Sequence, residues 1–507
     1  MGGRICTRRF TSERHQYYEA GAMRIPKTKF HISVERLVNE LNQYHQAGLK
    51  VIPYTLTYPG NLIFVNGIRS NDNNKQTAKA LGFTNVPEPY ADKTGPELLY
   101  EAIRTFVDIL QEDFEKGWEL LLEYDHCSFR SYLLNIERWP PSVIEFVETM
   151  CSQTNQFILS FPEMVMQSMD FKTKDWWTLE DGMDRLPEAL ARVVGLENIT
   201  FGARVQKVTK EQSDRIRIQA FRGGHVFEEV FDKVLLAIPP GAVRMIVERP
   251  LWPLVKEQGL RSMFFEPLYK IGIRFKSRFW EHTSPPSLGG QSTTDLPIRW
   301  IVYPSYGIEE EGPGVLLLYS WMTDALLWSS ITFEQRVHMA LTHLNTIYAQ
   351  FDVDVFDQFI AADDTPWAER NPMGDAMFLP GQYTEFFATA IEPEGNIYFA
   401  GEHLSRHHTW IAGALDSANT AVQQMLKAWS EESHKIPYLR PVKGVEDGFV
   451  PVIGDPEAPA VREEDERKKI LREGLLDIRA DPVKFRDSIL KRNTIQKLRP
   501  YNPPQVA

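Results

Sequence analysis

Cysteine is scarce in this chain. Its 507 residues include three cysteines, Cys6, Cys127 and Cys151, which are scattered along the sequence and odd in number. This pattern argues against a disulfide framework and favours free thiols in a reducing compartment. None of the three has the spacing of a metal-ligand pair, so the sequence predicts no metal site.

Long apolar runs and basic stripes are also missing. The most apolar stretches, such as Val234–Ile238 and Val315–Tyr319, have the length of a strand and fall far short of the roughly 20 residues that cross a bilayer. No run of Lys and Arg forms a basic stripe, and the net charge is -12. The sequence therefore predicts no membrane span and no nucleic-acid partner.

What is present is the composition of a soluble globular protein, with 43% apolar and 24% charged residues. A chain of this length is expected to fold as two or three domains. No secretory signal peptide is visible, because arginines interrupt any apolar region near Met1. The sequence favours a soluble intracellular protein, but the compartment stays open because the beginning of the chain looks incomplete.

The incomplete beginning is visible in the glycine pattern. No Gly-x-Gly-x-x-Gly string occurs in the chain, although this strand–turn–helix element cradles the pyrophosphate of a dinucleotide. Met1 is followed at once by Gly2-Gly3-Arg4, which suits a tight turn against a ligand and a cation that pairs with phosphate. We expect a truncated sequence rather than a protein that naturally begins here.

The most informative segment lies near residue 400. A short apolar strand, Ile397–Ala400, runs into Gly401-Glu402, and a loop with Trp410 leads to a helix start at Gly413. Free N–H groups at a helix start suit a pyrophosphate or the carbonyl edge of a flavin ring, although the spacing alone also fits an ordinary strand–turn–helix. The residue string resembles the C-terminal FAD-binding signature of the flavin amine oxidases, the family of the monoamine oxidases and L-amino-acid oxidases.

The resemblance implies an α/β fold with mixed sheets, the FAD-dependent amine oxidase fold. It has a dinucleotide-binding domain, a mixed-sheet substrate domain and a helical insertion. We expect the FAD-binding domain in residues 1–16, 175–265 and 385–432, without its N-terminal βαβ unit, and the substrate-binding domain in 17–70 and 266–384. The helical domain is expected in 71–174 and a C-terminal extension in 433–507.

Hydrophobic periodicity predicts the main elements within these ranges. Helices are expected over residues 31–50 and near 333–350, and most of 87–169 has a helical pattern. Strands are expected at Tyr54–Tyr58, Leu62–Val65, Arg204–Val208, Arg215–Ala220, Val226–Val230, Val234–Ile238, Tyr269–Phe275, Val315–Ser320 and Ile397–Ala400. The four strands between residues 204 and 238 are interpreted as a β-meander that closes on the dinucleotide sheet.

The resemblance also assigns cofactor contacts residue by residue. It places the FAD-binding positions at Gly3, Arg4, Met23, Arg24, Val205, Glu402, Trp410, Ile411, Ala412 and Gly413. Monoamine oxidases tether FAD through a cysteine shortly before the FAD-binding strand, but the comparable stretch Met373–Gly381 has none. The FAD is therefore expected to be noncovalent.

Arg24 is the clearest indication of the substrate. An arginine in the string Gly-Ala-Met-Arg-Ile-Pro, among residues that bury it, is costly unless it meets an anion, and its planar fork matches a carboxylate. Taken alone, the string also fits a structural salt bridge. It resembles the L-amino-acid oxidase branch, in which this arginine binds the α-carboxylate of the substrate.

Three further substrate-binding positions and one catalytic position complete the predicted site. By resemblance, Tyr319 is the second carboxylate ligand, and Trp321 and Trp410 shape the side-chain pocket. Lys270 matches the catalytic lysine that holds a water against the flavin and assists reoxidation by oxygen. From the residues alone, Tyr319 also fits a core tyrosine and Lys270 an edge lysine with its ammonium in solvent.

The predicted function is FAD-dependent oxidative deamination of an L-amino acid to a 2-oxo acid, ammonia and hydrogen peroxide. The partners are a small-molecule amino acid and oxygen, and a homodimer stays open. Three alternatives remain: an amine oxidase, a flavin amino-acid monooxygenase that forms an amide, and a truncated, non-catalytic member of the family. The apolar and aromatic pocket residues suggest a bulky hydrophobic or aromatic amino acid.

Overall fold

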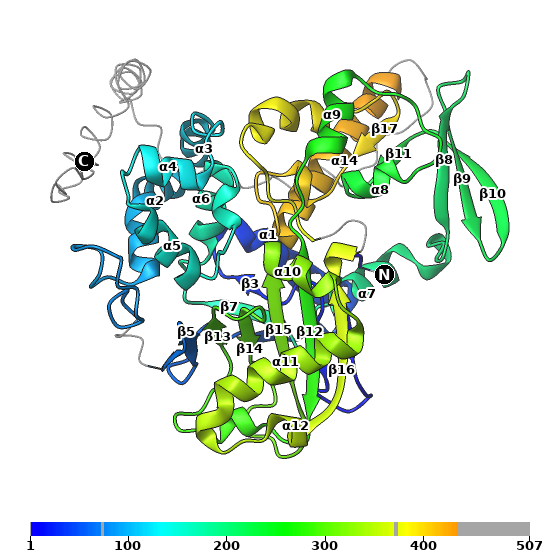
Figure 1. Cartoon of the computed structure of the whole chain (residues 1–507). Coiled ribbons are helices and arrows are strands. Elements are labelled where there is room, and N and C mark those ends of the chain that lie inside the picture. The colour runs from blue at the N-terminus through cyan, green and yellow to red at the C-terminus, as the bar shows by residue number, and fades with distance from the viewer. Residues whose placement is uncertain (1, 72–75, 370–373, 434–507) are drawn as a thin grey trace.

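A mixed sheet with a helical layer forms the lower part of the molecule in Figure 1, a computed structural model that describes residues 2–71, 76–369 and 374–433. The seven strands have the order β16-β12-β15-β14-β13-β5-β6. Their bounds are β16 Phe359–Pro366, β12 Leu268–Phe275, β15 Gly314–Trp321, β14 Trp300–Val302, β13 Gln291–Thr294, β5 Ile63–Val65 and β6 Ile68–Ser70.

The two faces of this sheet pack against different cores, because side chains alternate along each strand. Leu316 and Leu318 of β15 pack in one core with α10 (Met322–Ser329) and α11 (Phe333–Tyr348), whereas Leu317 belongs to a separate core. Because side chains alternate along a strand, Tyr319 and Trp321 share the face of Leu317. The face away from α11 is therefore the one that carries the predicted site residues.

Three smaller sheets and a parallel strand pair contain the other described strands. β11 (Val234–Leu236) pairs in parallel with β17 (Ile397–Phe399), which leads to the long helix α14 (Ile411–Ser433). β8 (Arg204–Lys210), β9 (Ile216–Arg222) and β10 (His225–Phe231) form an antiparallel meander at one side (Figure 1). β7 (Trp176–Leu179) lies between β3 (Ile25–Pro26) and β4 (Val51–Pro53), and β1 (Thr7–Arg9) pairs with β2 (Tyr17–Glu19).

Helices gather in a lobe on the side opposite the meander (Figure 1). Thr94 begins the first of them with a capping box: its hydroxyl accepts from Glu97 N, and the Glu97 carboxylate accepts from Thr94 N. The lobe contains α2 Gly95–Glu112, α3 Phe114–Leu122, α4 Phe129–Asn135, α5 Pro141–Met150 and α6 Phe161–Asp170. The other helices are α1 Ile32–His45, α7 Arg185–Val194, α8 Pro240–Arg244, α9 Leu254–Ser262, α12 Val355–Gln358 and α13 Ala388–Ile391.

Most predicted elements are present, with three corrections. The predicted strand Tyr54–Tyr58 is wrong, because pairing with β7 ends at Pro53 and the chain then leaves the sheet. The meander has three strands, since β11 pairs with β17 instead. β7 was not anticipated, because Trp176–Leu179 is buried throughout and its apolar residues do not alternate with polar ones.

The domain boundaries stay predictions. Helices α2–α6 fall within the expected helical range 71–174, and the strands of the large sheet fall within 17–70 and 266–384. Apart from Ser433, the expected C-terminal extension lies outside the described residues. No helix in the described part of the chain has the length and apolarity needed to cross a membrane.

Candidate active site

An ion pair between a half-buried arginine and a buried glutamate joins the beginning of the chain to the loop after β17. Arg4 Nη1 donates to Glu402 Oε1 at 2.5 Å and to the Gly374 carbonyl at 3.0 Å. Glu402 also accepts from Thr409 N at 2.9 Å and from Ala376 N at 3.0 Å. Burial opposes ionisation of Glu402, but Arg4 and two neighbouring histidines outweigh it and lower the pKa of Glu402 to about 2. Glu402 is therefore ionised, and its carboxylate holds the beginning of the chain against the loop after β17.

Two glycines allow the backbone segments of this region to pack closely. Gly21 N donates to Cys6 O at 3.0 Å, and a Cβ on Gly21 would lie 1.9 Å from Arg4 O. A Cβ on Gly413 would lie 1.9 Å from His407 O. Any side chain at either position would push backbone apart, so the glycines are required by packing.

Arg24 lies in an aromatic cage without an acidic partner. Its guanidinium carbon is 5.2 to 5.8 Å from the ring centroids of Tyr54, Phe171, Trp176 and Trp300, and we call these four residues with Arg24 the Arg24 cluster. The side chain is 5% exposed, and its Nε makes no hydrogen bond. Among the described residues, no Asp or Glu forms an ion pair with it; its contacts are with Tyr54 Oη at 3.5 Å and Met23 Sδ at 3.8 Å.

Tyr319 and Trp321 reach this cluster from strand β15. The Trp300 ring, which faces Arg24, lies 5.9 Å from the ring of Tyr319 and 4.6 Å from that of Trp321. Burial raises the pKa of Tyr319, so its phenol stays protonated and can donate a hydrogen bond. The structure thus brings Arg24, Tyr319 and Trp321 around one indole ring.

Lys270 lies beside Tyr319 in the adjacent strand. The two residues are directly opposite in the antiparallel register of β12 and β15, and Lys270 Nζ is 4.5 Å from the Tyr319 ring centroid. Nζ donates to Gly21 O at 2.6 Å and to Glu19 O at 3.3 Å. Burial, and then the charge of Arg24, lower the pKa of Lys270 to about 7. Contrary to the edge-lysine alternative, its ammonium group is buried.

Trp410 completes the group from the loop before α14. Its ring lies 6.1 Å from Phe171 and 6.0 Å from Trp176, both of which face Arg24. The His31 ring meets Trp410 edge-on at 4.8 Å, and His31 Nε2 lies 3.1 Å from Asp170 Oδ1. The four predicted substrate-binding residues therefore surround shared aromatic neighbours.

The remaining predicted cofactor positions lie at three places: the first turn of α14, the turn before Arg4, and strand β8 of the meander. Ile411, Ala412 and Gly413 form the first turn of α14, whose N–H groups have no partner within the helix. Gly3 has φ +56° in the turn before Arg4. Val205 lies in the meander, on β8 opposite Ala220, rather than in the loops that hold Arg4 and Glu402.

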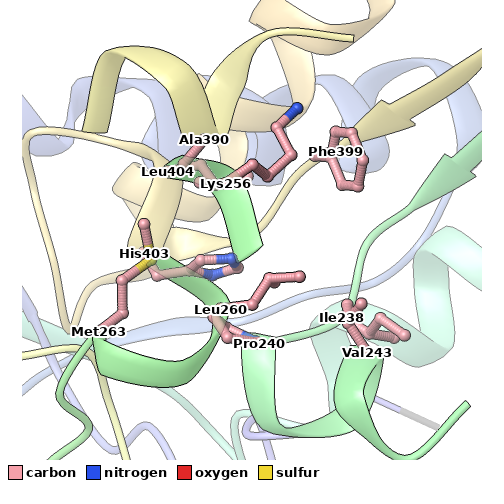
Figure 2. A pocket seen from close by; sticks show the side chains of 10 residues that line it. All are labelled: Ile238, Pro240, Val243, Lys256, Leu260, Met263, Ala390, Phe399, His403 and Leu404. Atoms are coloured by element: carbon pink, nitrogen blue, oxygen red, sulfur yellow. The ribbon is translucent and has the colours of Figure 1, made fainter. Parts of the chain in front are cut away.

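An apolar cavity lies beyond the ends of the parallel strands β11 and β17. Figure 2 shows the His403 ring and Leu260 among its walls, which are formed by Ile238, Pro240, Val243, Lys256, Leu260, Met263, Ala390, Phe399, His403 and Leu404. Ligands of α/β folds bind beyond the carboxyl ends of parallel strands. A second cavity shares Met23 and Tyr54 with the surroundings of Arg24 and continues to Glu19 and Tyr306.

Comparisons with known proteins identify the family. The model of the flavin-containing amine oxidoreductases matches residues 1–426. The chain belongs to this family of flavin-containing amine oxidoreductases. This confirms the family predicted from the sequence, and membership in this family implies a flavin cofactor.

The relatives of this amine oxidoreductase include both amino-acid and amine oxidases. A Dictyostelium discoideum protein provisionally named a bifunctional amine oxidase is 30% identical over 496 residues, which cover 90% of this chain and 45% of that protein. L-amino-acid oxidase 4 of Hebeloma cylindrosporum is 27% identical, with 84% and 76% covered. The chain thus spans less than half the length of the first relative.

The fold class is confirmed by a solved structure. The structure of a putrescine oxidase with bound putrescine superimposes on this chain with a TM-score of 0.64 and a sequence identity of 15%. The match covers 84% of this chain and 91% of the putrescine oxidase. At this identity the likeness shows the fold alone. The mixed helix-and-sheet architecture is that of the FAD-dependent amine oxidases.

The residues of this amine oxidoreductase fit part of a flavin site. Gly413 leaves no room for a side chain beside the first turn of α14, and the buried His407 Nε2 and His403 Nδ1 of the preceding loop have no hydrogen-bond partner among the described residues. Such orphaned polar atoms fit a ligand that supplies partners. The Gly-x-Gly-x-x-Gly turn for the pyrophosphate is not in the chain.

Sequence reasoning missed the rings and acids that frame the predicted residues. Phe171, Trp176 and Trp300 come from three separate segments, and no local spacing marks them as neighbours of Arg24. Glu163 was also missed: its Oε2 accepts from Phe378 N at 2.7 Å and lies 2.8 Å from His408 Nδ1. The paired histidines before Trp410 were the available signal, but nothing indicated their partner.

Proposed function

We propose that this protein is an FAD-dependent L-amino-acid oxidase, which converts an L-amino acid to a 2-oxo acid, ammonia and hydrogen peroxide. The observation that carries the proposal is Arg24, a buried guanidinium with no acidic partner among the described residues. Burying an unpaired charge is costly, so the site is built for an anion. The α-carboxylate of an amino acid is such an anion, and an amine substrate has none.

Arg24 and Tyr319 act on the substrate by position. In this proposal the Arg24 fork and the protonated Tyr319 phenol hold the carboxylate, which fixes the direction of the Cα–H bond. Trp321 and Trp410 form walls of the pocket for the substrate side chain and exclude water from it. The aromatic walls are rigid, so the bound geometry needs little further ordering.

Noncovalent FAD would be held by the segments at residues 3–4, 23–24, 205, 402 and 410–413. The side chain of Arg4 is already directed by Glu402, and the first turn of α14 offers N–H groups. When bound, FAD would accept a hydride, which carries both electrons, from the substrate, and oxygen would take up these two electrons with two protons to give hydrogen peroxide. The released imino acid takes up water to give the 2-oxo acid and ammonia.

Lys270 is proposed to hold a water at the reaction centre during reoxidation. With a pKa of about 7, its amino group can exchange a proton near neutral pH. Its two carbonyl contacts, Gly21 O and Glu19 O, fix the side chain in the buried face of β12.

The test is peroxide release by the full-length protein supplied with FAD, using a panel of L-amino acids and matched amines. Oxidation of L-amino acids with formation of the 2-oxo acid is the expected result. Peroxide from amines but from no L-amino acid would overturn the proposal in favour of an amine oxidase. An amide product identifies a monooxygenase, and a protein that retains no flavin absorbance once unbound FAD has been removed is a non-catalytic chain.

A further inference from the structure

Two acidic residues converge beside Tyr319, outside the residues assigned so far. Glu266 precedes β12, and its N–H donates to Asp375 O at 2.9 Å, so the segments around these residues run side by side. An isolated bridge between Phe265 and Ala376 continues this pairing. Glu266 is 3% exposed, and Gln156 Nε2 of the helical lobe donates to its Oε1 at 2.6 Å.

The acid pair has no cation of its own. Within residues 2–71, 76–369 and 374–433, neither Glu266 nor Asp375 forms an ion pair, and Asp375 Oδ1 is buried without a hydrogen bond. Arg4, whose charge acts on Asp375, is bound to Glu402. Lys270, on which Asp375 also acts, donates instead to two backbone carbonyls.

The acid pair and Arg24 share Tyr319 as a neighbour. Glu266 lies two residues before Leu268, which pairs with Trp321 just as Lys270 pairs with Tyr319, so it extends the strand that carries Lys270. The charges of Asp375, Glu266 and Arg24 also act on the Tyr319 hydroxyl, and those of Arg24 and Asp375 act on Lys270. One site therefore has a buried cation and two acids around the same phenol, and none of the three forms an ion pair within the described residues. The guanidinium favours an anion in the ligand, and the acids favour a cation.

Building on the proposed function, we propose that Glu266 and Asp375 bind the cationic end of the substrate side chain, so that the substrate is a basic L-amino acid such as lysine, ornithine or arginine. A second carboxylate near Asp375 would repel a phosphate, so the pair does not suit the pyrophosphate of a cofactor. Burial raises the pKa values of both acids, and the charge of Asp375 raises that of Glu266 further while the charge of Glu402 raises that of Asp375, so without a cation they retain a proton, which a basic side chain replaces. This substrate class replaces the hydrophobic side chain suggested by the sequence.

The direct test compares L-lysine with L-norleucine, which has the same chain length without the ammonium group. Using the FAD-loaded full-length protein, we expect kcat/KM for lysine to exceed that for norleucine by about 100-fold, because norleucine leaves the buried acids without a partner. Glu266→Gln keeps the shape of the side chain and should remove most of this difference. Asp375→Asn should act in the same direction.

A binding measurement separates recognition from catalysis. The probes 6-aminohexanoate and hexanoate both have a carboxylate but no α-amino group, so neither can be deaminated at Cα. Calorimetry should show at least about tenfold tighter binding of 6-aminohexanoate, and Glu266→Gln should abolish the difference. Glu257→Gln is the matched control: Glu257 is already paired with Arg249 at 2.6 Å, so its loss should leave the ratio unchanged.

The outcomes distinguish this inference from the proposed function. If norleucine and lysine are oxidised equally well while activity still requires Arg24, the acid subsite is wrong and the amino-acid oxidase proposal stands. A lysine preference that persists in both Glu266→Gln and Asp375→Asn also overturns the subsite. Oxidation of cadaverine, which is lysine without its carboxylate, together with no oxidation of any L-amino acid overturns both.

Discussion

Arg4 and Arg24 are close in sequence and lie in the same part of the fold, but their surroundings differ. Arg4 is bound to Glu402 and to a backbone carbonyl, whereas Arg24 is surrounded by aromatic rings with no acid paired to it in the described chain. A charge with a counter-ion holds segments together, while a buried charge that has only aromatic neighbours gains most from a ligand of opposite charge. The difference assigns Arg4 to the architecture of the site and Arg24 to recognition.

Replacing Arg24 gives the largest expected effect. Arg24→Ala should lower kcat/KM for L-amino acids by about 100- to 1000-fold, because it removes the charge that pairs with the carboxylate. Activity on an amine of the same shape should change little. Steady-state peroxide assays measure both, and Arg36→Ala, an exposed arginine on α1, serves as the control. If kcat/KM fell equally for the amine and the amino acid, Arg24 would not recognise the carboxylate and would have a structural role like that of Arg4.

Glu402→Gln tests the paired arginine and should act on stability. Breaking a buried ion pair on one side costs about 3–5 kcal/mol, which chemical denaturation at pH 7 can measure. The pKa of Glu402 is about 2 in the folded protein and near 4.5 when unfolded, so its contribution is present above pH 4.5 and is lost as the pH falls toward 2. The two proteins should therefore converge in stability under acid. A constant difference down to pH 2 would contradict the pairing.

Lys270→Met should change stability less and in the opposite direction. The pKa of Lys270 is about 7 in the folded protein against an ordinary 10.5, so the buried charge destabilises the fold fully below pH 7. This penalty disappears as the pH rises to 10.5. The variant should be more stable than the parent by about 2 kcal/mol at pH 6, with the gap closing toward pH 10.

The same Lys270 variant has a kinetic readout. Stopped-flow measurements should show slower reoxidation by oxygen with reduction by substrate largely preserved, because the proposed role of Lys270 is in reoxidation. If reduction slows as much as reoxidation, Lys270 has a general structural role. A stability gap that does not vary with pH would show that burial does not lower its pKa.

The elements that the sequence predicted correctly are those that short stretches of the chain determine. The β17–Glu402–Trp410–α14 order and the strand that contains Tyr319 follow from hydrophobic patterning and turn residues. The cage around Arg24 does not, because Phe171, Trp176 and Trp300 meet only when a helix end and two different sheets come together. Glu266 and Asp375 were missed for the same reason: neither is unusual in its own segment, and only their pairing without a cation is informative.

The smallest expected effect concerns the hydroxyl that touches Arg24. Tyr54 Oη lies 3.5 Å from Arg24 Nη1, at the limit of a hydrogen bond, and the Tyr54 ring also faces the guanidinium. Tyr54→Phe keeps the ring and removes this contact, so KM for L-amino acids should rise only about 2- to 5-fold, which corresponds to about 0.5–1 kcal/mol. Tyr54→Ala removes the ring as well and should cost more. If Tyr54→Phe were as damaging as Arg24→Ala, the hydroxyl rather than the unpaired guanidinium would be the group that binds the carboxylate.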